Sequence, residues 1–260
     1  ARGGVENIDI EKATKQRIVV INTPNHNANA VAEYTIGLMI AETRNIARSH
    51  YSLKNTGWRE IYPNTENIPE LSNLKIGLIG FGQIGKLVAK KLQSFGVILQ
   101  VYDPFVSEEI MKEYGCYPVS LGELLKSSDV ISLHVRLCDK TRHMIGNEEF
   151  KKMKPSSYFI NTARAGLVDE NALIEALKKK MISGAAIDVY EKEPTPKDHP
   201  LFSLDNVTVT NHRSGDTRNS YWDAPIMMAK QLLKILKGEK PDYIVNPQVF
   251  KDLDLSNIKL

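Results

Sequence analysis

Residues 74–103 constrain the fold of this chain more than any other stretch of its sequence. They begin with a short apolar run and continue through a turn that contains Gly80, Gly82 and Gly85. Apolar residues at helical spacing follow, and a second apolar run ends in Asp103. This order of strand, glycine turn, helix, strand and acid is typical of a dinucleotide-binding unit.

Each part of this stretch has an expected physical role. We expect Gly80 to permit the tight turn, Gly82 to let the backbone approach a pyrophosphate, and Gly85 to let the helix pack close to the strand. The helix N-terminus offers unpaired N–H groups to the phosphates. Asp103 can accept hydrogen bonds from the hydroxyls of the adenosine ribose. The alternative is an ordinary strand-to-helix turn without a nucleotide.

The residue at the end of the second run also bears on the choice of cofactor. The carboxylate of Asp103 would repel a 2′-phosphate, and the next residues, Pro104 and Phe105, supply no arginine to neutralise one. The sequence therefore favours NAD over NADP.

Composition excludes several other classes of protein. The 260 residues are 42% hydrophobic, enough for a buried core, and carry a net charge of +3, which gives no support to nucleic-acid binding. Cys116 and Cys138 show no metal-binding spacing, so we expect no metal site and a reduced, cytoplasmic compartment. No apolar run has membrane-spanning length, and no signal peptide is visible.

Strands and helices alternate along the rest of the chain, which predicts an α/β fold with a doubly wound parallel sheet. The last helix starts at Thr217 or at Asp223, since Pro225 suits only a first turn. Besides the helix between the two apolar runs of residues 74–103, the other expected helices cover residues 27–50, 107–114, 121–126, 148–153 and 169–180. The expected strands cover residues 17–21, 74–79, 97–102, 130–134, 158–161, 185–189 and 207–210.

Polar residues gather where three of these strands end. Arg164 follows one strand, Asp188 and Glu193 follow the next, and His212 follows the last. Ligands of open parallel sheets bind outside the carboxyl ends of the strands. We therefore expect these side chains at the edge that the glycine turn also faces.

These blocks resemble those of the D-isomer-specific 2-hydroxyacid dehydrogenases, a family that includes the D-3-phosphoglycerate dehydrogenases. The resemblance covers nearly the whole chain. It rests on the glycine turn with Asp103, on Ile160–Asp169, on Gly184–Val189 with Glu193 and Pro194, on His212, and on Asn7–Asp9, Asn22–Pro24 and Val31–Glu33.

The resemblance implies three catalytic residues. Arg164 would hold the substrate carboxylate, which a guanidinium fork matches. His212 would donate a proton to the carbonyl oxygen as hydride arrives and take it back in oxidation. Glu193 would accept a hydrogen bond from the other imidazole nitrogen. Asp188 would bind the nicotinamide carboxamide.

The resemblance also implies two wider sets of contacts. The residues that it places at the cofactor are Gly80, Gly82, Gln83, Ile84, Gly85, Asp103, His134, Thr141, Thr162, Ala163, Arg164, Asp188 and His212. Those that it places at the substrate are Gly3, Gly4, Val5, Arg164, His212 and Arg213.

Less specific interpretations stay open for several of these residues. Arg164 could be a surface residue at a helix N-terminus, and Glu191 competes with Glu193 as the partner of the histidine. His134 could serve packing alone. The remaining histidines are expected at the surface or in packing roles: His26, His50, His143 and His199.

The sequence departs from the family pattern in ways that add positive charge. Arg136 stands where proline is usual, and Arg213 and Ser214 follow the histidine where small or apolar residues are usual. Arg2 stands where a glycine is common. Asn211 replaces a proline, and Ala165 replaces a glycine. This charge favours a substrate with a second anionic group, such as 3-phosphoglycerate; alternatively, Arg136 and Arg213 point into solvent.

The resemblance implies a division of the chain into parts. Residues 1–23 would be the remnant of a flavodoxin-like substrate domain, the rest of which would precede Ala1. Residues 24–212 would form the Rossmann NAD-binding domain, with a dimerisation helix and arm over 27–70. Residues 213–260 would return to the substrate domain. Trp58 in the arm could reach a neighbouring subunit's active site or pack on its own helix.

We therefore expect a homodimeric, NAD-dependent oxidoreductase that interconverts a D-2-hydroxy acid and its 2-oxo acid. Formate-type relatives are disfavoured because they lack a glutamate equivalent to Glu193. The alternative is an NAD(H)-responsive corepressor-type binding protein, which uses the same scaffold and keeps the same three residues.

Overall fold

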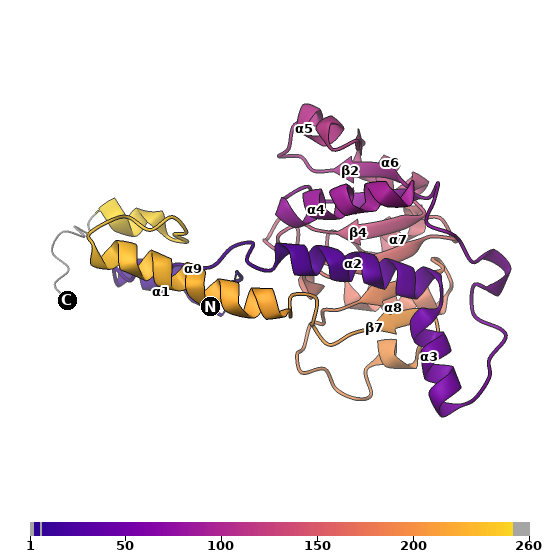
Figure 1. Ribbon diagram of the computed structural model, residues 1–260. Coiled ribbons are helices and arrows are strands. Elements are labelled where there is room, and N and C mark those ends of the chain that lie inside the picture. The colour runs from indigo at the N-terminus through magenta and orange to yellow at the C-terminus, as the bar shows by residue number, and fades with distance from the viewer. Residues whose placement is uncertain (1–2, 6, 252–260) are drawn as a thin grey trace. The chain divides into compact units, whose positions relative to one another are not determined.

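The computed structural model describes residues 3–5 and 7–251 of the chain (Figure 1). Arg2 lies outside the described residues. The chain divides into two compact units, one of residues 31–214 and the other of residues 1–30 with 215–260. No helix in the described part is both long enough and apolar enough to span a bilayer.

Residues 31–214, all of them described, contain one seven-stranded sheet in the order β3-β2-β1-β4-β5-β6-β7. All neighbouring strands pair in parallel, as the alternating pattern predicts. The order reverses between β1 and β4, where a doubly wound sheet opens a crevice for ligands. The strands are β1 (Lys75–Ile79), β2 (Ile98–Tyr102), β3 (Tyr117–Pro118), β4 (Val130–Leu133), β5 (Tyr158–Asn161), β6 (Gly184–Ile187) and β7 (Val207–Val209).

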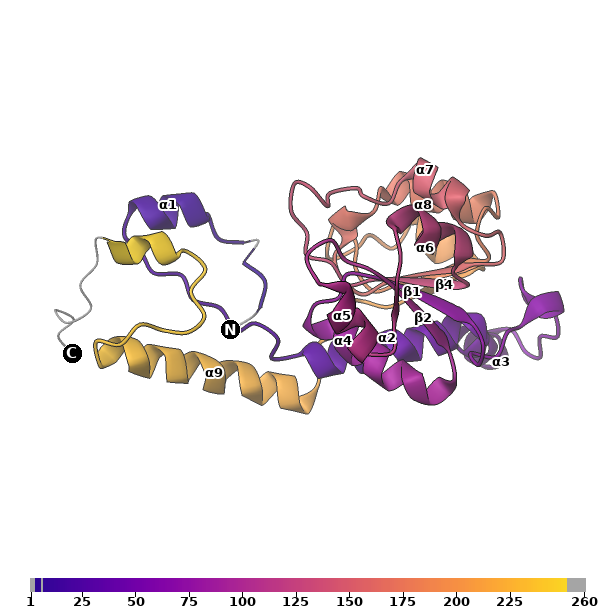
Figure 2. The same ribbon diagram turned by 90° about the horizontal axis from the view of Figure 1, so that it is seen from above.

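Helices cover both faces of this sheet (Figure 2). Helices α2, α4 and α5 supply apolar side chains to the core on one face, and α6, α7 and α8 supply those on the other. The bounds are α2 (Ala28–Thr43), α3 (Ile46–Asn55), α4 (Gln83–Leu92), α5 (Glu108–Glu113), α6 (Leu121–Ser127), α7 (Asn147–Lys152) and α8 (Glu170–Lys178).

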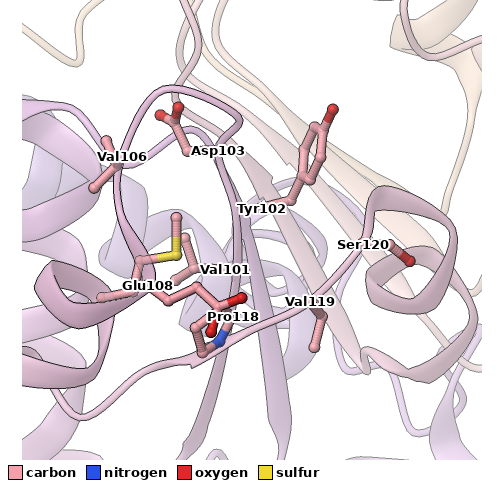
Figure 3. A pocket seen from close by; sticks show the side chains of 9 residues that line it. Val101, Tyr102, Asp103, Val106, Glu108, Pro118, Val119 and Ser120 are labelled. Carbon is pink, nitrogen blue, oxygen red and sulfur yellow. The ribbon is translucent and has the colours of Figure 1, made fainter.

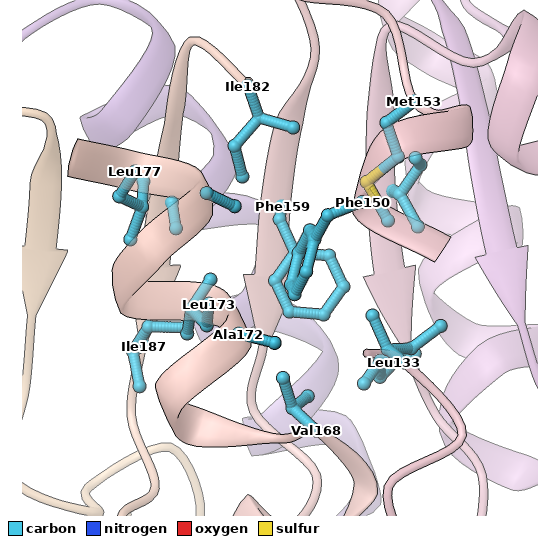
Figure 4. Close-up of a cluster of buried hydrophobic side chains, with 14 of the residues drawn as sticks. Leu133, Phe150, Met153, Phe159, Val168, Ala172, Leu173, Leu177, Ile182 and Ile187 are labelled. Carbon is cyan, nitrogen blue, oxygen red and sulfur yellow. The ribbon is translucent and has the colours of Figure 1, made fainter. Parts of the chain in front are cut away.

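The core between the sheet and α7–α8 fixes the positions of the strand ends (Figure 4). Phe150 from α7 and Phe159 from β5 pack edge to face, with ring centroids 5.5 Å apart. Both rings are fully buried, as are Leu133 and the neighbouring Ile182. Such close packing holds the loops that follow β4, β5 and β6 on a rigid base.

The single helix predicted over residues 27–50 is wrong, because α2 and α3 are separate. The chain bends at Asn45, whose φ of +57° is left-handed. Asparagine tolerates this conformation. Its amide also donates to Oδ1 of Asn64 at 2.6 Å, a partner 19 residues further along the chain.

A buried ion pair lies at the junction of α2 and α3. Glu42 Oε1 accepts from the guanidinium of Arg48 at 2.5 Å, and the two side chains are 1% and 7% exposed. The other oxygen of Glu42 accepts from Thr208 on β7 at 2.6 Å. Burial raises the pKa of Glu42 to about 7, against the opposing effect of Arg48.

The other unit contains α1 (Ile10–Lys15), α9 (Arg218–Leu236) and a 3-10 turn over Pro247–Lys251. The strand predicted over residues 17–21 is wrong: only Ile21 makes a bridge, to Ile244. The N–H of Val20 instead donates to the side chain of Asn246 at 2.8 Å. Helix α9 begins after Thr217, so Pro225 lies inside it.

Candidate functional site at the carboxyl edge of the sheet

The predicted site residues follow five adjacent strands. Gly80 follows β1, His134 follows β4, the turn at Thr162–Arg164 follows β5, Asp188 follows β6, and His212 stands three residues after β7. Because the strands are parallel, these residues lie along one edge of the sheet. They start at the crevice between β1 and β4 and end at β7.

The glycines of the turn meet different physical demands. Gly80 has φ of +99°, and a Cβ there would lie 2.7 Å from the backbone of Val135. A Cβ on Gly85 would overlap the carbonyl oxygen of Gly80. By contrast, a Cβ on Gly82 would meet nothing within 4 Å, and its φ of −72° suits any residue. Packing thus explains Gly80 and Gly85 but leaves open space at Gly82, where α4 begins with Gln83 and Ile84.

Asp103 lies next to this turn. Its Oδ2 accepts from the backbone N–H of Phe81 at 2.7 Å, and its Oδ1 accepts from that of Phe105 at 2.9 Å. The carboxylate therefore ties the loop after β2 to the glycine turn after β1. A cavity of about 320 Å³ adjoins it and is lined by Tyr102, Val106 and six others besides Asp103 (Figure 3).

His134 follows β4 beside the glycine turn. The backbone N–H of His134 donates to the carbonyl of Ile79 at 2.7 Å. Its Nε2 is buried and has no hydrogen-bond partner among the described residues. Burial lowers the pKa of the ring to about 4, so the imidazole is neutral near pH 7. An unpaired buried nitrogen at this place is a polar contact that a ligand could satisfy.

The turn that carries Arg164 is held by Asn161, a buried residue that the sequence analysis did not single out. Its Oδ1 accepts from the N–H of Ala163 and its Nδ2 donates to the carbonyl of Arg164, both at 3.0 Å. The guanidinium of Arg164 donates to the carbonyl of Ala163 at 2.8 Å. The hydroxyl of Thr162 lies 2.7 Å from the hydroxyl of Thr35 on α2.

Asp188 is fully buried and organises the loop after β7. Its Oδ1 accepts from the hydroxyl of Thr210 at 2.6 Å and from the N–H of Arg213 at 3.0 Å. Its Oδ2 accepts from the N–H of Ser214 at 2.9 Å. The backbone N–H of His212 donates to the Asp188 carbonyl at 2.8 Å. Asp188 thus positions the histidine loop, which its sequence context did not indicate.

His212 and Glu193 are in contact. Nδ1 of His212 lies 2.7 Å from Oε2 of Glu193, with the side chains 44% and 37% exposed. Because a carboxylate only accepts hydrogen bonds, Nδ1 carries the proton of this contact. Glu191, the competing partner, instead lies 3.7 Å from Nε2 of His143.

Other predicted residues lie in the loop after β4 or in the other unit. The hydroxyl of Thr141 donates to the carbonyl of Arg136 at 2.7 Å, inside the loop after β4. Arg136 itself is exposed. Gly3, Gly4 and Val5 belong to the other unit, and their part in a substrate site stays a prediction.

Comparison with known proteins decides the family. Residues 36–214 match the NAD binding domain of the D-isomer specific 2-hydroxyacid dehydrogenases. The chain belongs to this family. The match ends at Ser214, directly after the histidine loop.

Among family members, the chain is 43% identical over 245 residues to the D-3-phosphoglycerate dehydrogenase of Methanocaldococcus jannaschii, covering 94% of this chain but 46% of that relative. It is 39% identical to the glyoxylate reductase of Thermofilum pendens, covering 99% of this chain and 76% of the relative. The chain thus spans less than half of the first relative's length.

A solved member of the dehydrogenase family has the same fold. The D-lactate dehydrogenase of Lactobacillus jensenii with NAD+ matches with a TM-score of 0.82 and 30% identity, over 94% of this chain and 76% of that one. The open space at Gly82, the orphaned Nε2 of His134 and the carboxylate of Asp103 fit the cofactor of an NAD-binding domain.

Proposed function

We propose that the protein is an NAD-dependent oxidoreductase that interconverts a D-2-hydroxy acid and its 2-oxo acid. The observation that carries this proposal is the contact of His212 with Glu193 at the sheet edge that also holds the glycine turn. A proton donor, a carboxylate-binding arginine and a dinucleotide site are the groups that such a reaction needs.

The residues of this chain divide the work. Arg164 binds the carboxylate of the acid through its planar guanidinium, which sets the position of the neighbouring carbonyl carbon. His212 gives a proton from Nε2 to the carbonyl oxygen in reduction and takes it from the hydroxyl in oxidation. Glu193 accepts a hydrogen bond from Nδ1, which fixes the orientation of the ring and leaves Nε2 for the substrate. The nicotinamide, when bound, supplies or accepts the hydride.

The relatives differ in the acid that their names give, so the substrate must be inferred from charge. Arg136 and Arg213 add positive charge to the loops after β4 and β7. We infer that the acid carries a second anionic group. Additional cations near the site would favour such an acid over one with a single anionic group. An oxo acid with a phosphate should then be reduced with a lower KM than glyoxylate.

We also infer a homodimer that forms through α2, α3 and the arm behind them. Apolar side chains are exposed on α3 and the arm, with Trp58 at 83% and Ile61 at 75%. Exposed apolar patches of this kind mark interfaces. Sedimentation equilibrium should give twice the mass of one chain, and a Trp58→Asp, Ile61→Asp variant should shift toward the monomer. We further propose a cytoplasmic location, which the free thiols of Cys116 and Cys138 support.

The test is NADH oxidation by the full-length protein with a panel of 2-oxo acids, followed by absorbance. Turnover of at least one of them, with NADH preferred to NADPH, supports the proposal. Tight NADH binding without turnover of any oxo acid would instead favour the corepressor-type binding protein.

A further inference from the structure

A second histidine–glutamate pair lies in the segment next to the His212–Glu193 pair. Nε2 of His143 is 3.7 Å from Oε1 of Glu191, and the side chains are about half exposed. Glu191 is two residues before Glu193 in the loop after β6, so this contact acts on the segment that presents the Glu193 carboxylate.

The backbone of His143 reaches a different loop. Its N–H donates to the carbonyl of Gly166 at 2.8 Å, in the turn that begins at Arg164. The chain then continues to Ile145, which bridges Val168. One residue therefore contacts both the turn that carries Arg164 and the segment that carries Glu193.

The fold itself gains little from a histidine at this position. His143 has φ of +51°, a left-handed conformation in which a Cβ is unfavourable and glycine is preferred. An exposed ion pair contributes little to stability, and this one is charged only when the ring carries a proton. A histidine that costs backbone energy and adds little stability is better explained by a function at the neighbouring His212–Glu193 pair.

We propose that His143 is a positioning residue, which ties the 190–194 segment to the Arg164 turn and so fixes the place of Glu193 relative to His212. Within this segment, Oε1 of Glu193 accepts from the backbone N–H of Tyr190 at 3.0 Å. If the segment becomes more mobile, this N–H is exposed to water more often and exchanges its hydrogen faster. This inference rests on the proposed function, because positioning matters only if His212 transfers a proton.

The test compares His143→Gly with His143→Lys in the full-length protein. Lys180 has the same left-handed backbone conformation, with φ of +52°, which shows that a lysine in this protein can adopt it. Lys180→Gly is therefore the matched control. His143→Gly should keep or raise the melting temperature. It should speed hydrogen exchange in peptides covering 190–193 about threefold or more, and lower kcat three- to tenfold with the KM for NADH unchanged.

His143→Lys places a permanent cation opposite Glu191 and should restore both the exchange rate and kcat relative to His143→Gly, whereas Lys180→Gly should change neither. If hydrogen exchange over residues 190–193 is the same in His143→Gly and the wild type, the tether is refuted, whatever the activity of the variant. Faster exchange with unchanged kcat overturns the positioning role. Faster exchange in a protein that turns over no 2-oxo acid supports the tether but refutes the proposed function.

Discussion

Nδ1 of His212 lies 2.7 Å from Oε2 of Glu193, and each residue makes a further hydrogen bond to the loop after β6. The Glu193 carboxylate accepts from the N–H of Tyr190, and the His212 backbone donates to the carbonyl of Asp188. The contact between imidazole and carboxylate is therefore set before any substrate binds. Such preorganisation is what proton transfer in an active site requires.

The glycines of the turn give a matched pair of predictions. Gly82→Ala should leave the free energy of unfolding unchanged, because the new methyl meets nothing, but should weaken NADH binding about tenfold by filling the space beside the phosphates. Gly85→Ala should destabilise the protein by about 1–3 kcal/mol, because its methyl overlaps the Gly80 carbonyl. Denaturant unfolding and NADH fluorescence titration check both. Equal stability loss in the two variants would contradict the assignment.

Asp103 should set the choice between the two nicotinamide cofactors. Asp103→Asn removes the negative charge and keeps an acceptor oxygen for only one of the N–H groups of Phe81 and Phe105, because its amide nitrogen cannot accept a hydrogen bond. NADH affinity should fall about tenfold, since a charged hydrogen bond is lost, and NADPH affinity should rise. Titration of both cofactors measures the ratio, with exposed Asp139→Asn as the control. An unchanged ratio would mean that another residue selects the cofactor.

The buried Glu42 should make the protein less stable as pH rises. Its folded pKa is about 7, against 4.5 ordinarily. The folded state thus holds a proton that the unfolded state releases between these values, and stability is lost as pH rises from about 4.5 to 7, by at most about 3 kcal/mol. Glu42→Gln should flatten this dependence in denaturant titrations, whereas exposed Glu60→Gln should not. A wild-type slope that survives in Glu42→Gln would refute the assignment.

His134 should act with the opposite sign. Its folded pKa is about 4, below the ordinary 6.5. The unfolded state therefore takes up a proton first as pH falls, and stability is lost from about pH 6.5 down to 4, by about 1–3 kcal/mol. His134→Gln should remove this loss, and exposed His50→Gln should leave it in place. Identical acid profiles in wild type and His134→Gln would show that the ring does not titrate as described.

The sequence predicted the sheet well, because its buried strands are continuous apolar runs that need no knowledge of their partners. It missed β3, which has only two residues, Tyr117 and Pro118. It predicted a strand at 17–21 from β-branched residues, but a strand requires a neighbour, and only Ile21 finds one. The break at Asn45 depends on Asn64, which local periodicity does not reveal.

The contact between His212 and Glu193 was predictable from the sequence, but the hydrogen bonds that support the surrounding loops were less so. Arg164 and His212 each stand three residues after a strand, and Glu193 stands six residues after one. Asn161 and Asp188 act through bonds to the loops around them, and Asp188 reaches a partner 26 residues away. An asparagine that ends a fully buried strand was the one signal that could have identified Asn161.

The most direct test of the account is turnover by a His212→Ala variant of the full-length protein, measured as 2-oxo-acid-dependent oxidation of NADH. We expect kcat to fall by about 100-fold or more while NADH binds with unchanged affinity, which is what the proposed general-acid role of His212 requires. A variant that turns over the oxo acid at the wild-type rate would contradict it.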